Sequence, residues 1–374
     1  MDERIEKEHS IGSDRKPGMS GTTESPLADV PTDVEPSPGF WRIVWRRFRR
    51  DKFAMSGLLI VLVLLAVSYI APVIANNKPI VMRWNDRLYF PAVVEMAPFR
   101  WIVKYSELYP LDFDEIKKDR SVTLVMPVVP YSPIATSLDE TFLPPSSKHW
   151  MGTDNLGRDV FSRMLHGAGI SLKVGLVAVS IALLIGVLVG ALAGFYGGIV
   201  DIVLSRVIEV VICFPFLFLI LAVIVFLPPS IYSIMIVIGI TRWTSIARYT
   251  RGEFMKVKEQ EFTEAARALG VSDKTIIFRH ILPNSLAPVL VTATFGVANA
   301  ILIEAALSFL GLGIQPPTPS WGEILSVGRQ HIEIAWWLAT FPGLAIFVTV
   351  TAYNLLGEGL RDATDPKLVH PERR

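Results

Sequence analysis

Long apolar runs, separated by shorter polar segments, recur along this chain. A helix that crosses the hydrocarbon layer of a membrane needs about 20 consecutive, mostly apolar residues. Six segments meet this requirement and predict six membrane-spanning helices: 53–74, 171–195, 207–227, 231–247, 286–310 and 338–356. The 374 residues include 51% hydrophobic and 19% charged side chains, which is more apolar than an ordinary soluble domain. We therefore expect an all-α integral membrane protein.

The Lys and Arg residues of the short loops predict the orientation of these spans, because cytoplasmic loops carry an excess of both. One basic cluster precedes the first span and a second lies between the fourth and fifth spans, whereas the loop 311–337 contains only Arg329. This bias places both termini and the loop 248–284 on the cytoplasmic side. The two clusters consist of Arg42, Arg46, Arg47, Arg49, Arg50 and Lys52, and of Arg248, Arg251, Lys256, Lys258, Arg267, Lys274 and Arg279.

The ends of the chain differ from its middle. Residues 1–39 are rich in Ser, Pro, Asp and Glu, so we expect a disordered cytoplasmic tail rather than a secretory signal. Residues 40–74 would form an interfacial helix and the first span. Trp41, Val44, Trp45 and Phe48 recur at helical spacing, which favours a helix in the headgroup layer over a charged flank that only fixes topology. Residues 358–374 would form a second cytoplasmic tail.

The segment 75–165 predicts an extracytoplasmic insertion followed by a helix. Its first part, 75–149, is too polar for lipid and too long for a simple turn. β-prone pieces at 80–84, 89–94 and 122–129 predict a small hairpin-like cap. Thr153, Asp154 and Asn155 are typical of a turn or cap ahead of an outer helix. Residues 166–357 would then form the transmembrane core.

A row of small residues marks one face of the second predicted span. Ala182, Gly186, Gly190 and Gly194 are spaced by four, so this face lets a neighbouring helix approach closely. That neighbour is either another helix of this chain or a helix of a partner subunit. The row predicts packing rather than chemistry.

The cytoplasmic loop 248–284 predicts two short helices. Phe262, Ala265, Ala266 and Leu269 fall at i, i+3, i+4 and i+7, which gives a narrow apolar stripe on the first helix. Gly270 is typical of a helix that ends in a left-handed turn. A second helix would start at a Ser272 cap and stop before Pro283. With the alanines on its exposed stripe, such a knob can seat in a cleft of another protein, or it is a surface loop packed on the bundle.

Several kinds of chemistry are excluded by the sequence. No Gly-Lys-Ser or Gly-Lys-Thr phosphate loop is present, so this chain does not bind ATP in the usual P-loop arrangement. Cys213 is the only cysteine and the histidines are scattered singly, which argues against a metal site. The net charge of +1 argues against a nucleic-acid binder. We expect no directly bound cofactor and no catalytic residue.

The loop also carries a family resemblance. Glu264, Ala265, Ala266 and Gly270, followed by Ile277, His280, Pro283 and Asn284, resemble the E-A-A-x-x-x-G loop of binding-protein-dependent ATP-binding-cassette (ABC) importers. The segments 150–159 and 304–313 are similar to C-type permease subunits of dipeptide and oligopeptide systems. The resemblance covers nearly everything from Trp150 to Lys367, although Gly169 stands where family members often carry arginine.

The resemblance implies a type I importer permease fold with six transmembrane helices and an extracytoplasmic insertion after the first. It implies that Glu264, Ala265, Ala266, Gly270, Ile277, His280 and Pro283 couple the permease to an ATPase. The implied partners are a second homologous permease, two ATPase subunits that use ATP, an extracytoplasmic solute-binding protein, membrane lipid and a peptide substrate. The implied location is the bacterial inner membrane.

Alternative functions remain open at this point. The same machinery serves nickel complexes and other solutes in related systems, and the insertion around 75–79 and 89–91 resembles a subgroup linked to microcin C and longer peptides. An ion-gradient-driven transporter would show inverted repeats and broken helices, which the sequence does not convincingly show. A membrane scaffold without transport is a third hypothesis.

Two further groups of residues are candidates for the transport route. Glu304 and Asn299 lie in the fifth predicted span and would line the pathway or its outer gate. Alternatively, Glu304 is a carboxyl group hydrogen-bonded to a neighbouring helix. Trp321, Trp336 and Trp337 flank the sixth span, where we expect them to anchor the membrane interface rather than to contact peptide.

Overall fold

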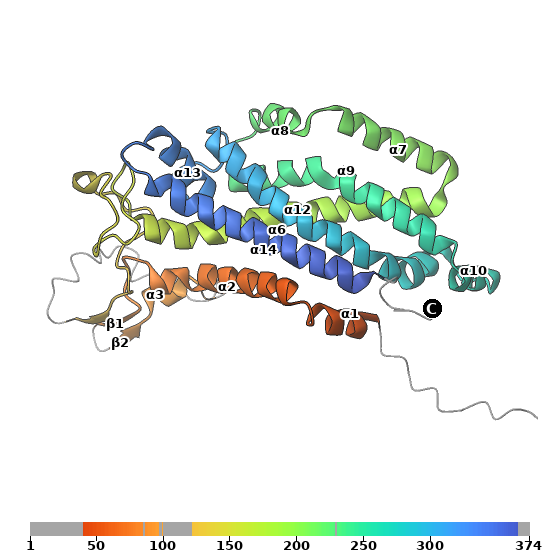
Figure 1. Cartoon of the computed structure of the whole chain (residues 1–374), viewed down its shortest axis with the longest axis horizontal. Helices are drawn as coiled ribbons and strands as arrows, with labels where there is room; N and C mark the ends of the chain where they lie inside the picture. The colour runs from red at the N-terminus through yellow and green to blue at the C-terminus, as the bar shows by residue number, and fades with distance from the viewer. Residues whose placement is uncertain (1–39, 85–86, 97–98, 100–121, 229, 366–374) are drawn as a thin grey trace, which may run out of the picture. The chain divides into compact units, whose positions relative to one another are not determined.

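The computed structural model describes residues 40–84, 87–96, 99, 122–228 and 230–365. The tail expected at 1–39 and residues 366–374 of the second tail lie outside the described residues. The elements, in chain order (Figure 1), are α1 Phe40–Phe48, α2 Lys52–Ile74, β1 Val81–Trp84, β2 Arg87–Tyr89, α3 Pro91–Val94, β3 Thr123–Val125, η2 Leu138–Glu140, α6 Val160–Tyr196, α7 Gly198–Cys213, α8 Phe216–Ile224, α9 Ile231–Lys258, α10 Glu261–Ala268, α11 Asp273–Thr275, η3 Ile276–Ile281, α12 Leu282–Phe309, α13 Trp321–Gln330 and α14 Trp337–Thr364.

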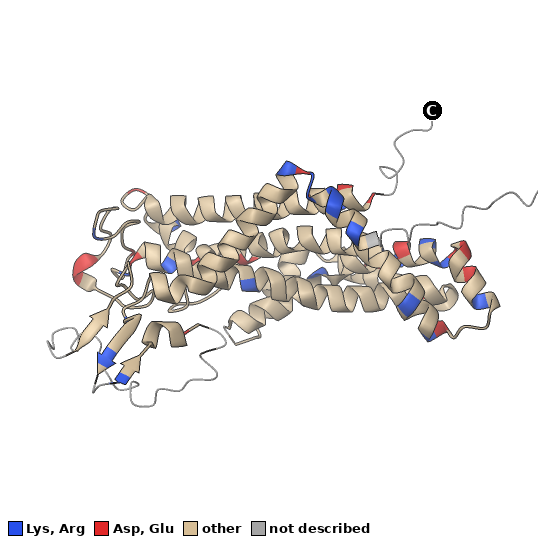
Figure 2. Cartoon of the chain, turned by 90° about the horizontal axis from the view of Figure 1, so that it is seen from below, with Lys and Arg blue, Asp and Glu red and all other residues tan. Residues whose placement is uncertain are grey.

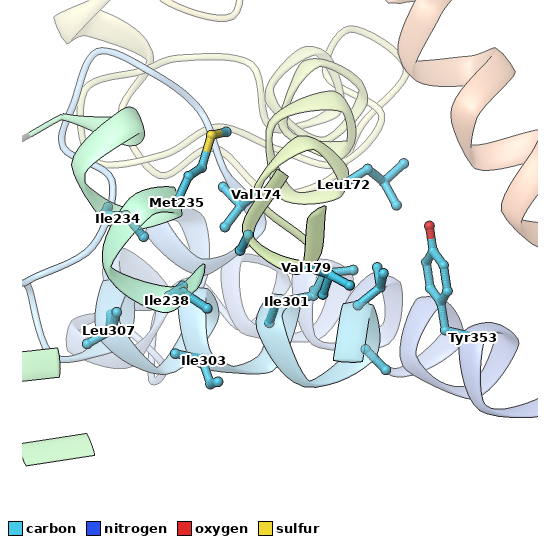
Figure 3. Packing of buried hydrophobic residues seen from close by; sticks show 14 of the residues in the cluster. Leu172, Val174, Val179, Ile234, Met235, Ile238, Ile301, Ile303, Leu307 and Tyr353 are labelled. Carbon is cyan, nitrogen blue, oxygen red and sulfur yellow. The ribbon is translucent and has the colours of Figure 1, made fainter. Parts of the chain in front are cut away.

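The long helices α2, α6, α9, α12 and α14 pack side by side into a bundle (Figure 1). Its largest apolar cluster includes Leu172 of α6, Ile238 of α9 and Ile301 of α12, each at most 1% exposed. Figure 3 shows where these three side chains lie among the other members of the cluster. Charged residues gather toward the two ends of the helices and are few along the middle (Figure 2), as expected for helices that lie in lipid.

Four of the described helical segments are long and apolar enough to cross a membrane: Lys52–Ile74, Val160–Tyr196, Asp273–Phe309 and Trp337–Thr364. The pair α7 and α8 makes a fifth if it counts as one span, although it bends by 82°. The straight helix expected at 207–227 is therefore wrong. Pro215 interrupts it, because proline pushes the preceding Phe214 into extended backbone, at φ −82° and ψ 127°.

Two other expected spans differ from the observed helices. α9 contains the predicted span 231–247, but it is not apolar enough to meet the same criterion, since Arg242, Arg248 and Arg251 lie along it. α6 is one helix of 37 residues, so the expected separation into an outer helix and a span starting at 171 is wrong. The small residues Gly167, Ala168 and Gly169 continue the helix instead of breaking it.

The row of small residues on α6 faces α9 of the same chain. A Cβ atom added to Gly186 would come within 2.9 Å of the Trp243 carbonyl oxygen, and one added to Gly190 within 2.4 Å of the Ala247 carbonyl oxygen. At Gly194 the nearest atom would be the Arg251 carbonyl oxygen, at 2.7 Å. The predicted close approach is confirmed, and its partner is internal.

The insertion after α2 contains a three-stranded antiparallel sheet in the order β2-β1-β3. Met82 in the central strand pairs with Tyr89 on one side and with Leu124 on the other. The predicted cap is confirmed, with strands in the expected pieces 80–84 and 122–129. The strand expected at 89–94 is wrong beyond Tyr89, because Pro91 takes the first helical position of α3, where its fixed φ is favourable.

α1 is amphipathic, as its sequence predicts. Val44 and Phe48 are buried against Ala54 of α2 and Ala363 of α14, whereas Trp41 and Trp45 are about half exposed. One part of the apolar side of α1 therefore packs against the protein, and the other part is exposed. Anchoring of the two tryptophans in the headgroup layer stays a prediction.

Candidate functional site

The first helix of the loop 248–284, α10, ends as predicted. Gly270 has φ +74°, the left-handed conformation in which glycine carries no steric penalty. The Val271 N–H donates to the Ala266 carbonyl at 3.1 Å, and the Gly270 N–H donates to the Arg267 carbonyl at 3.0 Å. These two bonds form a Schellman motif. A side chain at Gly270 would therefore strain the turn that reverses the chain after α10.

α10 is fixed to the end of α9 by its inner face. The Thr263 hydroxyl donates to the Val257 carbonyl at 2.9 Å, and Ala266 is buried beside Phe254 and Ile276. The expected stripe with both alanines outward is thus wrong for Ala266. The small side chain of Ala266 allows α10 to lie close to α9, and this packing turns the neighbouring positions outward.

The outer face of the loop presents an apolar surface with no cover from the described part of the chain. Leu269 is 83% exposed, Phe278 68% and Phe262 46%. Glu264, Ala265 and Gly270 are exposed as well. Several large apolar side chains exposed on one short segment are typical of a surface that binds another protein. We call these six residues, Phe262, Glu264, Ala265, Leu269, Gly270 and Phe278, the coupling surface.

The second helix of the loop does not stop before Pro283, contrary to the prediction. The chain runs from α11 through the π-helical turn η3 into α12, with Pro283 near the start of α12. In η3 the Leu282 N–H donates to Ile277, five residues back. The wider turn changes the hydrogen-bond pattern just where proline lacks an N–H, so the helix continues.

Of the predicted coupling residues, Ile277 and His280 are half-buried in η3 and Pro283 is exposed. The His280 carbonyl accepts a hydrogen bond of 2.6 Å from the Asn284 side chain. The structure thus brings the predicted residues into one short region at the ends of α9 and α12. Buried contacts join α10 to α9 and to η3, which continues into α12.

Glu304 is fully buried in α12 and joins α12 to α13. Its Oε1 accepts hydrogen bonds from the hydroxyl groups of Ser308, at 2.8 Å, and Ser320, at 3.0 Å. Ser320 also caps α13 by accepting from the Glu323 N–H at 3.0 Å. This geometry favours the second of the two expected roles, a carboxyl group hydrogen-bonded to a neighbouring helix. Asn299, in contrast, is exposed.

Two of the three tryptophans expected at the membrane interface lie in the core. Trp321 and Trp337 are each 2% exposed, and only Trp336 is exposed, at 53%. The indole N–H of Trp321 donates to the Met164 carbonyl at 3.1 Å, and that of Trp337 donates to the Thr153 carbonyl at 3.0 Å. The expectation is wrong for this pair because buried backbone carbonyls satisfy their polar atoms.

The segment before α6 is built around a buried ionic network that sequence reasoning missed. Arg163 donates to Glu323, and Arg158 donates through Nε to Asp154 at 2.6 Å. All four side chains are at most 5% exposed. No local pattern pairs Arg163 with Glu323, since they are 160 residues apart. The same network fixes α13 to the start of α6.

None of the three predicted residues, Thr153, Asp154 and Asn155, caps α6. Asp159 caps the helix, because its Oδ1 accepts from the Ser162 N–H at 2.8 Å. Asp154 instead closes a turn by accepting from the Leu156 N–H at 2.9 Å. Burial raises the pKa of the Asp159 carboxyl group, while the bonds from Ser162 and from His149 lower it in part. Within the described residues, no group of three or more His, Cys, Asp or Glu side chains is placed to hold a metal ion.

Comparison with known proteins places this architecture in a family. Residues 186–370 match the model of the binding-protein-dependent transport system inner membrane component, and residues 39–91 match the N-terminal TM domain of oligopeptide transport permease C. A dipeptide transport system permease protein of Alkalihalophilus pseudofirmus is 35% identical over 92% of this chain and 96% of its own length. A glutathione transport system permease protein of Shigella flexneri serotype 5b is 40% identical over 88% of this chain and 91% of its own length.

Solved structures also resemble this chain. The inward-facing MetNI methionine ABC transporter matches with 20% identity and a TM-score of 0.45, over 55% of this chain and 98% of the other. The sequence relationships above span 92% and 88% of this chain. The chain therefore belongs to the family of inner-membrane permease components of binding-protein-dependent transport systems, and it is a multi-pass membrane protein.

Proposed function

We propose that this chain pairs with a second homologous permease to form the pathway of an ABC importer for di- and oligopeptides. The observation that carries the proposal is the coupling surface, an exposed apolar face held by buried contacts to the ends of α9 and α12. Two ATPase subunits would sit beneath the permease pair, and one of them would dock on this surface from the cytoplasm. The named substrates of the relatives, dipeptides and glutathione, support a short peptide as cargo.

In this proposal ATP is bound and hydrolysed by the partner subunits, and this chain contributes no catalytic residue and binds no cofactor itself. Closure of the ATPase pair would displace α10, and the rigid connections of α10 would transmit the movement to α9 and α12. The pathway would then open toward the outside, where a solute-binding protein releases its peptide. The bacterial inner membrane, with both termini in the cytoplasm, is the location that the basic loop residues support.

Replacement of Leu269 tests the docking role with little risk to the fold, because this side chain is 83% exposed. We expect L269E to lower the amount of ATPase that co-purifies with the permease about tenfold or more, since a buried interface charge without a partner is costly. ATP-driven peptide uptake should fall in parallel. Leu88 on β2 is 61% exposed and lies in the outer insertion, so L88E is the matched control.

Two further variants address residues of the family motif. E264K reverses an exposed charge, and G270V strains the left-handed turn; both should reduce co-purification more than L88E does. Wild-type ATPase binding and peptide uptake in L269E and E264K would disprove docking at this surface.

A further inference from the structure

Arg242 is a charged side chain in the middle of α9 with no ionic partner in the described part of the chain. It is half-buried, and its guanidinium carbon lies 5.4 Å from the centroid of the Phe216 ring of α8. Other arginines of this helix differ, since Arg251 forms an ion pair with Asp201. An unpaired cation at membrane depth is costly and is typical of a ligand or ion pathway.

A hollow of about 130 Å³ lies beside Arg242, between α6, α9 and α12. Its apolar wall includes Val179 of α6 and Ile238 of α9, which are both labelled in Figure 3. Ser245, Thr292 and Asn299 add polar groups to the lining. The volume is well below the roughly 300 Å³ or more of a site for a whole small ligand. The hollow thus fits one end of a chain molecule.

The hydrogen-bonding groups around the hollow favour an anion. Asn299 donates one amide hydrogen to the Phe295 carbonyl at 3.1 Å and keeps a second donor. The Thr292 hydroxyl already donates to the Pro288 carbonyl at 3.2 Å. The strongest free donors are therefore the guanidinium of Arg242 and the amide of Asn299. A planar guanidinium matches a carboxylate, with which it forms paired, charge-assisted hydrogen bonds.

Arg242 and Asn299 also lie at the same depth in the bundle. Arg242 is eleven residues from the first residue of α9, and Asn299 is ten residues from the last residue of α12. Both distances run from the helix ends that are remote from α10. At about 1.5 Å per residue, each side chain is roughly 15 Å deep, which is half of a hydrocarbon layer of about 30 Å. A peptide crossing the membrane would pass this level.

We propose that Arg242 and Asn299 bind the terminal carboxylate of the peptide in transit, so that the hollow forms this chain's half of a pathway site. The inference rests on the proposed peptide transport. A carboxylate of the second permease and a lipid phosphate are the rival occupants of the same donors, and the test below separates them.

The test uses the complete importer, with both permeases, the ATPases and the binding protein, reconstituted in phosphatidylcholine vesicles without anionic lipid. Uptake of a mixture of dialanine to pentaalanine and glutathione is measured for wild type, R242Q, R242K and N299A. R248Q is the matched control, since Arg248 is an exposed arginine of the same helix. The same peptides with C-terminal amides are measured in parallel, because an amide lacks the carboxylate but leaves the rest of the peptide unchanged.

We expect R242Q to lower uptake of the free acids about tenfold, N299A to lower it less, and R242K to keep an intermediate rate. Uptake of the amides, assembly of the complex and basal ATPase activity should be unchanged, and R248Q should match wild type. Equal losses for acids and amides, or free-acid uptake by R242Q within twofold of wild type, would overturn the proposal. Loss of the second permease from R242Q preparations would assign Arg242 to a permease contact instead.

A fall of R242Q uptake that appears only after anionic lipid is added would assign the donors to a lipid headgroup and also overturn the proposal. Failure of the proposed function gives a different result. In that case the wild-type importer itself would show no ATP-driven uptake of any peptide in the mixture. The proposed carboxylate site alone is disproved if the wild type transports the peptides and R242Q transports them equally well.

Discussion

The contact between α6 and α9 yields a sharp prediction for a pair of Gly→Ala substitutions. Alanine in a helix is about 1 kcal/mol more favourable than glycine, so both G190A on α6 and G252A on α9 gain this term. Nothing lies within 4 Å of a Cβ atom built on Gly252. A Cβ atom built on Gly190 would lie 2.4 Å from the Ala247 carbonyl oxygen and 2.7 Å from the Thr250 Cβ.

The magnitude follows from what has to move. The nearest atom to the new methyl group at Gly190 belongs to the backbone of α9, so the two helices must separate along a contact that also includes Gly186 and Gly194. Overpacking of this kind costs about 1–3 kcal/mol and cancels or exceeds the gain in helix propensity. The net effect is the overpacking cost less the propensity gain, so we expect G190A to be less stable than wild type by up to about 2 kcal/mol. We expect G252A to be more stable by about 0.5–1 kcal/mol.

Thermal unfolding of the purified transporter, monitored by tryptophan fluorescence in one detergent, measures the stability of both variants under the same conditions. The midpoint temperature of unfolding should fall by a few degrees for G190A and rise slightly for G252A. For a domain of about 150–250 residues, a change of about 1 kcal/mol in stability shifts this midpoint by about 2–4 °C. A G190A variant as stable as G252A would show that α6 and α9 do not rely on close backbone approach.

Two further predictions concern the buried polar contacts near the N-terminal end of α6. E323L leaves the Arg163 guanidinium buried without its carboxylate and should lower the free energy of unfolding by about 3 kcal/mol. The double variant R163M/E323L should recover most of this stability in the same unfolding assay. Equal stability of the single and double variants would contradict the pairing of Arg163 with Glu323. W337F removes the indole donor to the buried Thr153 carbonyl and should cost about 1–3 kcal/mol. W336F is its control and should stay within about 0.5 kcal/mol, because Trp336 is exposed.

The coupling loop illustrates how far local sequence reasoning reaches. The end of α10 at Gly270 was predictable, because only a few residue types tolerate a left-handed turn and glycine does so without strain. The burial of Ala266 was not, since both alanines satisfy the same helical spacing. Contact with Phe254 decides between them, and that contact depends on where α9 ends.

The interior of the bundle shows the same division. By itself the sequence determined that the long apolar runs become helices and that Gly186, Gly190 and Gly194 allow a close neighbour. It also determined that no phosphate loop is present. Each of these features depends on a short window of residues. Tertiary structure alone decided that α9 is that neighbour, that Trp321 is buried, and that the unpaired Arg242 borders a hollow. These features depend on side chains that lie far apart in the chain, and no local periodicity encodes which distant residues the packing of the helices brings together.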